Sequence, residues 1–179
     1  MTTKGSKSLV IDASVARAAG GDQATFPAAR FSREFLLNTL EICHRIVMNN
    51  QIKDEWKSHQ SRFARTWLRS MYARRKVTVV SDEVDQPLRD SVNDLNLSDS
   101  DRAAILKDIH LIEAARTSNK TVVSLDERAK RLMIKSCSTI RKLRGLLWIN
   151  PAMSPEQATN WLNARAPLPD EFLLNEPKP

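Results

Sequence analysis

Short apolar runs that alternate with longer amphipathic segments are the feature that most constrains the fold of this chain. Runs rich in Val, Ile and Leu end or begin near polar residues at five places, residues 9–11, 45–49, 77–80, 121–125 and 146–149. Strands that alternate with helices form a parallel sheet whose two faces are covered by those helices. We therefore predict one α/β domain, a three-layer α/β/α sandwich around a central parallel sheet of about five strands.

The segments between these runs have helical periodicity. Pro27 suits the first turn of a helix to about residue 43, and Ser98 suits the N-cap of a helix to about residue 118. A single helix over residues 53–74 would place four large apolar side chains on one core-facing stripe, namely Trp56, Phe63, Trp67 and Met71. Shorter helices are expected at 13–19 and 127–138, and the acidic stretch 81–101 is expected to be a hydrated loop.

The composition changes after Asn150, where six of the eight prolines follow. We assign residues 1–150 to the α/β domain and residues 151–179 to a C-terminal Pro-rich extension, with a short helix near 155–164. Apolar residues in this extension favour packing against the domain or against a second copy in a homodimer, and these are Trp161, Phe172, Leu173 and Leu174.

Several features predict a cytoplasmic protein that does not enter a membrane. No apolar run approaches the roughly 20 residues that span a bilayer. The polar N-terminus lacks the pattern of a signal peptide. The two cysteines, Cys43 and Cys137, lack metal-ligand spacing and suit buried free thiols in a reducing compartment.

Two carboxylates follow predicted strands directly. Asp12 comes after the first apolar run and Asp126 after the fourth. In open parallel sheets the active site lies outside the carboxyl ends of the strands, so both side chains should reach the same crevice. The alternative for each one alone is an ordinary helix N-cap.

Two further acids lie on predicted helices. Asp108 is a poor helix former inside an apolar-striped helix. The alternative interpretation is that Asp108 faces solvent and pairs with Lys107 or Arg116. Glu55 could equally be one of the many glutamates found on helix surfaces.

A converging set of four acids predicts a metal site. Carboxylates in one crevice repel one another unless a cation neutralises them, and oxygen ligands favour Mg²⁺ or Mn²⁺. The three histidines are scattered at 44, 59 and 110, so we expect each to be structural or on the surface. Such a site has the equipment for metal-assisted hydrolysis of a phosphodiester.

Three segments in order resemble the PIN-domain ribonuclease family. They are Val10-Ile11-Asp12-Ala13-Ser14-Val15, the stretch from Lys107 to Ala115, and Val122-Val123-Ser124-Leu125-Asp126. Each alone is a weak motif, but three at these spacings are fairly specific, and they cover roughly residues 8–150. The resemblance implies a flavodoxin-like fold and a Mg²⁺- or Mn²⁺-dependent endoribonuclease.

The resemblance also implies roles for single residues. Asp12, Asp108 and Asp126 would be the metal ligands, and Glu55 would complete the catalytic acids. Asp54 or Glu41 would replace Glu55 if the helix over residues 53–74 is placed differently. The family's hydroxyl positions, where the carboxylates are oriented by hydrogen bonds, correspond to Ser14 and Ser124.

Many members of that family are toxins of bacterial toxin–antitoxin modules that act as dimers and are silenced by a small protein. An antitoxin and a second copy of the chain are therefore candidate partners. The acidic stretch 81–101 and the extension depart from the compact toxin pattern, which bears on the toxin assignment more than on the nuclease assignment.

The charge distribution fits a polyanionic substrate such as RNA. The chain carries a formal net charge of +7, with eight Lys or Arg at 53–76 and seven at 128–144. Basic blocks release counterions when they bind phosphates, although they can also be ordinary solvated helix faces. The expected RNA contacts are Arg62, Arg65, Arg69, Lys130, Arg131 and Lys135.

Competing functions remain at this point. The main alternative is a catalytically inactive PIN-like module that binds RNA or a protein. A haloacid-dehalogenase-like phosphatase would need an aspartate where Ser14 stands. A dinucleotide enzyme would need a glycine-rich loop, and the chain has four glycines in all.

Overall fold

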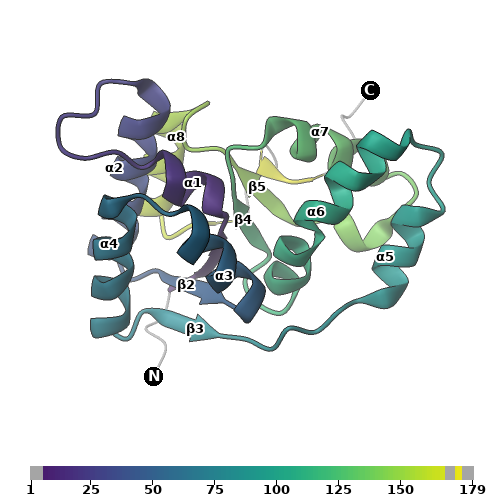
Figure 1. Ribbon diagram of the computed structural model, residues 1–179, viewed down its shortest axis with the longest axis horizontal. Coiled ribbons are helices and arrows are strands. Elements are labelled where there is room, and N and C mark those ends of the chain that lie inside the picture. Colours follow the sequence, from purple (N-terminus) through teal and green to yellow (C-terminus); the bar gives the residue numbers. More distant parts are fainter. Residues whose placement is uncertain (1–5, 168–171, 175–179) are drawn as a thin grey trace.

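The sheet is the centre of the molecule. The computed structural model describes residues 6–167 and 172–174. Five parallel strands form one sheet in the order β3-β2-β1-β4-β5 (Figure 1). Their bounds are β1 Ser8–Ile11, β2 Arg45–Met48, β3 Val77–Val79, β4 Thr121–Val123 and β5 Leu147–Ile149. The predicted parallel five-stranded α/β architecture is confirmed.

Helices cover both faces of the sheet and complete a three-layer sandwich. Figure 1 shows α1, α2, α4 and α8 on one side and α5, α6 and α7 on the other. The helices are α1 Ala13–Ala18, α2 Pro27–Glu41, α3 Asn50–His59, α4 Arg62–Ala73, α5 Gln86–Asn93, α6 Asp99–Arg116, α7 Glu127–Ser136 and α8 Pro155–Asn163, with a 3₁₀ turn at Arg141–Leu143. No helix in the described residues is both long and apolar enough to cross a bilayer.

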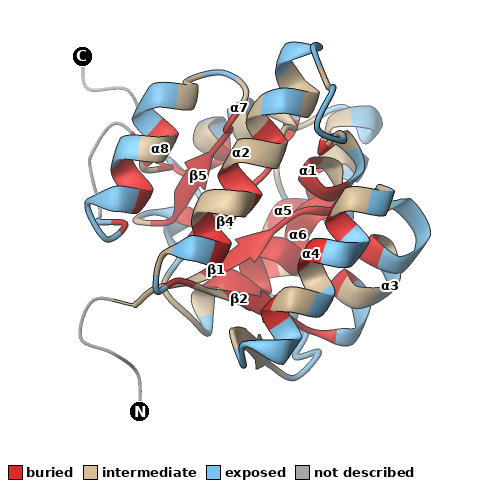
Figure 2. Cartoon of the chain, turned by 90° about the vertical axis from the view of Figure 1, so that its left-hand side faces the viewer, coloured by how far each residue is buried: buried red, intermediate tan, exposed pale blue. Residues whose placement is uncertain are grey.

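Burial explains why the strands read as continuous apolar runs. Figure 2 shows the central strands buried while the outer faces of the helices are exposed. Val10 in β1, Val47 in β2 and Val122 in β4 are completely inaccessible to solvent. A strand covered on both faces has no solvent side, so its sequence does not alternate between apolar and polar residues.

The predicted single helix over 53–74 is wrong, because the chain breaks there into α3 and α4. Gln60 is extended, and the Ser61 hydroxyl caps α4 by accepting from the Ala64 N–H at 3.1 Å. The Ser61 N–H leaves the helical pattern and donates to the Ala16 carbonyl of α1 at 3.0 Å. Trp56 and Trp67 nevertheless stack in the core, with ring centroids 5.8 Å apart.

The acidic stretch 81–101 is not the hydrated loop that its charge suggested. Its middle forms α5, which Asp85 caps by accepting from the Leu88 N–H at 3.0 Å. Leu88 and Val92, four residues apart, share a face that is fully buried against the domain. Arg89 on the same helix forms two hydrogen bonds with the buried Glu113 carboxylate of α6, at 2.9 and 2.8 Å.

The described part of the C-terminal extension packs on the domain. Helix α8 lies against α2, and Trp161, Phe172 and Leu174 are buried. Leu173 forms an isolated antiparallel bridge with Leu147 of β5.

The two cysteines differ in their surroundings. Cys137 is buried, as expected. The same expectation for Cys43 is wrong, because this residue lies exposed after the end of α2.

The strand order places a switch point in the middle of the sheet. From β1 the chain adds β2 and then β3 on one side, and it returns to place β4 and β5 on the other side of β1. The ends of β1 and β4 are therefore neighbours, with Ile11 paired to Val123. Connections diverge from such a point and leave a crevice beyond the strand ends, where ligands of open α/β sheets bind.

Candidate active site

Asp12 is held rigidly at the end of β1 by two serine hydroxyls. Its Oδ2 accepts from the Ser14 hydroxyl at 2.5 Å and from the Ser124 hydroxyl at 2.7 Å. Asp12 occupies the N-cap position of α1, but its side chain makes no capping hydrogen bond. The alternative of a simple helix cap therefore does not describe this carboxylate, whose orientation is set across the two central strands.

The same two hydroxyls organise the turn that follows β4. Ser14 Oγ accepts from the Leu125 N–H, and Ser124 Oγ accepts from the Asp126 N–H, each at 3.1 Å. Each serine thus donates to Asp12 and accepts from the backbone beside Asp126. The two strand ends are joined by hydroxyls whose donor and acceptor functions are both used.

Asp126 serves partly as a helix cap. Its Oδ1 accepts from the Ala129 N–H at 2.8 Å and closes the first turn of α7. The capping alternative is therefore real for this residue, but it uses only one of the two carboxylate oxygens. Asp126 still lines the same cavity as Asp12.

Asp108 is a buried carboxyl group in the middle of α6. It is 5% exposed, and its pKa is raised from the ordinary 3.8 to about 7. Burial is the main cause, followed by the negative charge of Asp12, with smaller contributions from Asp126 and Glu55. Lys107 opposes the shift, but its ammonium lies 3.9 Å away and is largely exposed. Arg116, the other suggested partner, pairs with Asp85 instead.

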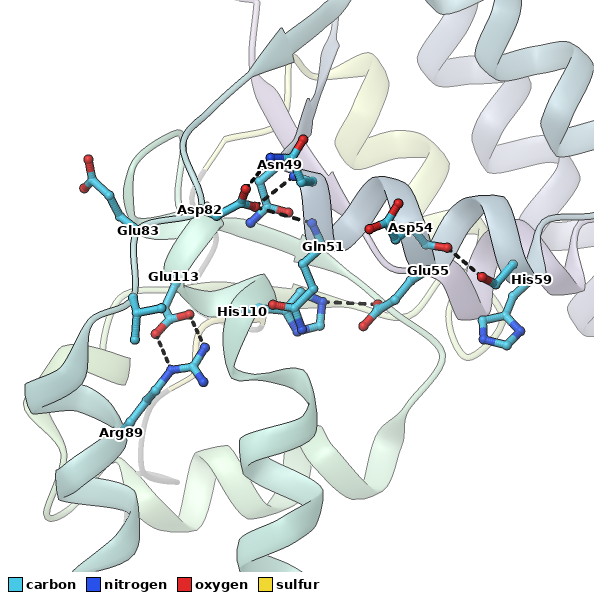
Figure 3. A pocket seen from close by; sticks show the side chains of 13 residues that line it. Asn49, Gln51, Asp54, Glu55, His59, Asp82, Glu83, Arg89, His110 and Glu113 are labelled. Atoms are coloured by element: carbon cyan, nitrogen blue, oxygen red, sulfur yellow. Dashed lines mark hydrogen bonds and ion pairs between the residues drawn. The ribbon is translucent and has the colours of Figure 1, made fainter.

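Glu55 reaches the site from α3. The Trp56 indole donates to the Ile11 carbonyl at 2.8 Å, which ties α3 to the residue before Asp12. Glu55 Oε2 lies 3.1 Å from His110 Nε2, and the two side chains point toward one another in Figure 3. Asp54 is exposed on α3, and Glu41 is exposed at the end of α2.

The four predicted acids surround one cavity of about 480 Å³ at the switch point. They come from four separate segments, which are the ends of β1 and β4 and the helices α3 and α6. Ser14, His59, Arg17 and Lys107 also line this cavity. A second cavity of about 490 Å³, drawn in Figure 3, shares Glu55 and His59 with the first.

The six basic residues predicted to contact RNA lie outside the cavity lining. Those on α4 are exposed, and those on α7 are exposed or half-buried. They are Arg62, Arg65 and Arg69 on α4 and Lys130, Arg131 and Lys135 on α7. The cations at the cavity itself are Arg17 and Lys107, which sequence reasoning did not select.

His110 was also missed as a site residue. It is 2% exposed, and its Nδ1 lies 3.0 Å from the Lys107 carbonyl oxygen while its Nε2 faces Glu55. The sequence did carry a signal, since the polar residues Asp108, His110 and Glu113 interrupt an apolar helix. All three are buried on α6. A helix packed between the sheet and other helices buries more than one stripe.

The donor set suits a hard divalent cation, although the side chains do not already stand as a ligand cage. Among the residues that the structure describes, no three His, Cys, Asp or Glu side chains converge closely enough to hold a metal ion. The residues that could hold one are Asp12, Asp108 and Asp126, with oxygen ligands only. The raised pKa of Asp108 fits such a role, since a bound cation would offset both the burial and the repulsion that favour the protonated form.

Comparison of the chain with models of known protein families finds no match, and comparisons with curated proteins and with solved structures find none either.

Proposed function

We propose that this protein is a Mg²⁺- or Mn²⁺-dependent endoribonuclease of the PIN type that hydrolyses RNA phosphodiester bonds. The observation that carries the proposal is the arrangement of Asp12, Glu55, Asp108 and Asp126 around one cavity at the switch point of a parallel sheet. Of these four acids, Asp126 also stabilises the fold by capping α7, and the other three make no helix cap. Burial, together with the negative charge of the other acids, raises the pKa of Asp108 and costs stability.

In this proposal the acids hold the catalytic metal, which would polarise the phosphate and activate water for in-line attack. Asp12 is the fixed member, because both serine hydroxyls hold one of its oxygens. Asp108 would supply a buried carboxylate, whose charged form a bound cation would favour. Asp126 contributes the oxygen that does not cap α7, and Glu55 completes the cluster from α3.

The surroundings of the cavity suit a polyanionic substrate. Arg17 and Lys107 place positive charge at the lining, where it offsets the acids for an approaching phosphate. The Ser61–Ala16 hydrogen bond brings the start of α4 beside α1, and the residues that follow these two, Arg62 and Arg17, are both exposed. Arg65 and Arg69 continue this basic face along α4. We therefore assign the RNA strand to the path from the cavity over α4.

A non-catalytic PIN-like module that binds RNA or protein is the second candidate. It is favoured by the finding that, among the described side chains, the acids do not converge as a ready ligand cage. Such a module would bind RNA through its basic helices without cleaving it.

One experiment separates the two candidates. A mixed single-stranded RNA is incubated with the protein and Mg²⁺ or Mn²⁺, and cleavage is compared with that by the variants Asp12→Asn and Asp108→Asn. Asp99→Asn, on the exposed first turn of α6, is the matched control. Metal-dependent cleavage that both site variants lose and the control retains supports the nuclease. RNA binding without cleavage in all four proteins supports the second candidate.

A further inference from the structure

The buried imidazole of His110 connects two of the four acidic segments. On one side its Nδ1 meets the backbone carbonyl of Lys107, the residue before Asp108, at 3.0 Å. On the other its Nε2 meets the Glu55 carboxylate of α3 at 3.1 Å. The imidazole therefore lies between two oxygen atoms, a backbone carbonyl on one side and a carboxylate on the other.

We infer that His110 is a positioning residue that holds the Glu55 carboxylate in place beside the metal-binding acids. This inference rests on the proposed function, because it gives His110 its purpose within that site. Glu55 stands on the wall between the two cavities, and both cavities are lined by it. Without a partner, a glutamate on this wall could turn toward either cavity.

The surroundings of Glu55 leave His110 as its one anchor among the described residues. The Glu55 side chain is 33% exposed, whereas the His110 side chain is 3% exposed and cannot follow it into solvent. No other hydrogen bond or ion pair to the Glu55 carboxylate is present in the described part of the chain.

Outer partners that orient metal-binding groups typically change metal affinity or activity about 10- to 100-fold when they are removed. Two substitutions test the hydrogen bonds of the two ring nitrogens separately. His110→Gln keeps an amide N–H at the place of Nε2 and can still donate to Glu55. His110→Asn reaches only the place of Nδ1, so it can satisfy the Lys107 carbonyl but leaves Glu55 free.

The experiment measures Mn²⁺ affinity by titration calorimetry, together with kcat and KM for RNA. We expect His110→Asn to lose about 10- to 100-fold in Mn²⁺ affinity, with KM for RNA unchanged, and His110→Gln to restore most of that loss. In a Glu55→Gln background, His110→Asn should cause no further loss, because a residue that acts through Glu55 has nothing left to position. His44→Gln controls for the loss of a buried histidine, since His44 is fully buried and bonds the distant Leu162 carbonyl at 3.0 Å.

The outcomes distinguish this inference from the proposed function. Full Mn²⁺ affinity in a folded His110→Asn protein would overturn the role of His110 and leave the proposed nuclease function unaffected. Equal losses in His110→Asn, His110→Gln and His44→Gln would show a general effect of core disruption and would also overturn it. If the parent protein neither binds Mn²⁺ nor cleaves RNA, the proposed function is refuted, and this inference is refuted with it.

Discussion

The buried Asp108 makes the metal-free protein lose stability as the pH rises. In the folded protein its pKa is about 7, whereas the ordinary value of 3.8 applies to the unfolded chain. Between those two values the folded state binds more protons than the unfolded state. The free energy of unfolding therefore falls with increasing pH in this window, by up to about 1.4 kcal/mol per pH unit from this group alone.

The substitution Asp108→Asn isolates this effect, because asparagine imitates the neutral carboxyl group at every pH. Below pH 3.8 the variant and the parent should be nearly equal in stability. Above pH 7 the variant should be more stable by up to about 4 kcal/mol, which is the pKa difference of Asp108 converted to free energy. Asp99→Asn, on the same helix but exposed, should differ little from the parent at any pH.

Urea unfolding followed by tryptophan fluorescence, in the presence of a chelator and from pH 4.5 to 8, measures this difference. Added Mn²⁺ at about 100 times its Kd should then stabilise the parent by about 2.7 kcal/mol at pH 7.5 and leave Asp108→Asn unaffected. A stability difference between parent and Asp108→Asn that is constant across the pH range would refute the electrostatic reasoning. Stabilisation of both proteins by Mn²⁺ would place the metal elsewhere.

Further substitutions test the framework around the acids. Ser124→Ala should lower the free energy of unfolding by about 1–3 kcal/mol, because it removes a hydrogen bond from the buried Asp12 carboxylate. It should also reduce metal-dependent cleavage of RNA. Unchanged cleavage would show that Asp12 does not need this hydrogen bond. Charge reversal of Arg62 and Arg65 should weaken RNA binding and flatten its salt dependence without unfolding the protein, as a filter-binding series over salt concentration would show. The pair Lys130 and Arg131 should give the same change if α7 also contacts phosphates, and an unchanged, salt-insensitive affinity would exclude that helix.

The sheet could be predicted from the sequence because its strands are buried on both faces. Runs such as Leu9 to Ile11 are apolar throughout, and the residue after the run marks the strand end. This reasoning also selected Asp12 and Asp126, since the ends of parallel strands share one edge of a sheet. Burial of Asp108 was foreseeable for a different reason, its poor fit to an apolar helix.

Features decided by contacts between distant segments could not be predicted. The apolar spacing from Trp56 to Met71 runs through the break between α3 and α4, and the break depends on the bond of Ser61 to Ala16 in another helix. Helix α5 was hidden because the stretch 81–101 carries seven acidic residues, whereas only Leu88 and Val92 do the packing of this helix.

The contact between Glu55 and His110 joins residues 55 positions apart. It requires α3 and α6 to approach one another over the end of the sheet, which no local pattern reveals. The histidine therefore looked isolated in the sequence.

The contact of the C-terminal extension with β5 has a consequence for the behaviour of the protein in solution. Strand β5 is the last strand of the sheet, and the Leu174 N–H donates to the Leu146 carbonyl at 2.7 Å beside the Leu147–Leu173 bridge. An uncovered sheet edge is a template for strand addition by another molecule. A chain cut after Asn150 would bare both this edge and the apolar surface under Trp161 and Phe172. The extension therefore covers one edge of the sheet and protects it from aggregation. Its removal should raise the molecular mass measured by light scattering.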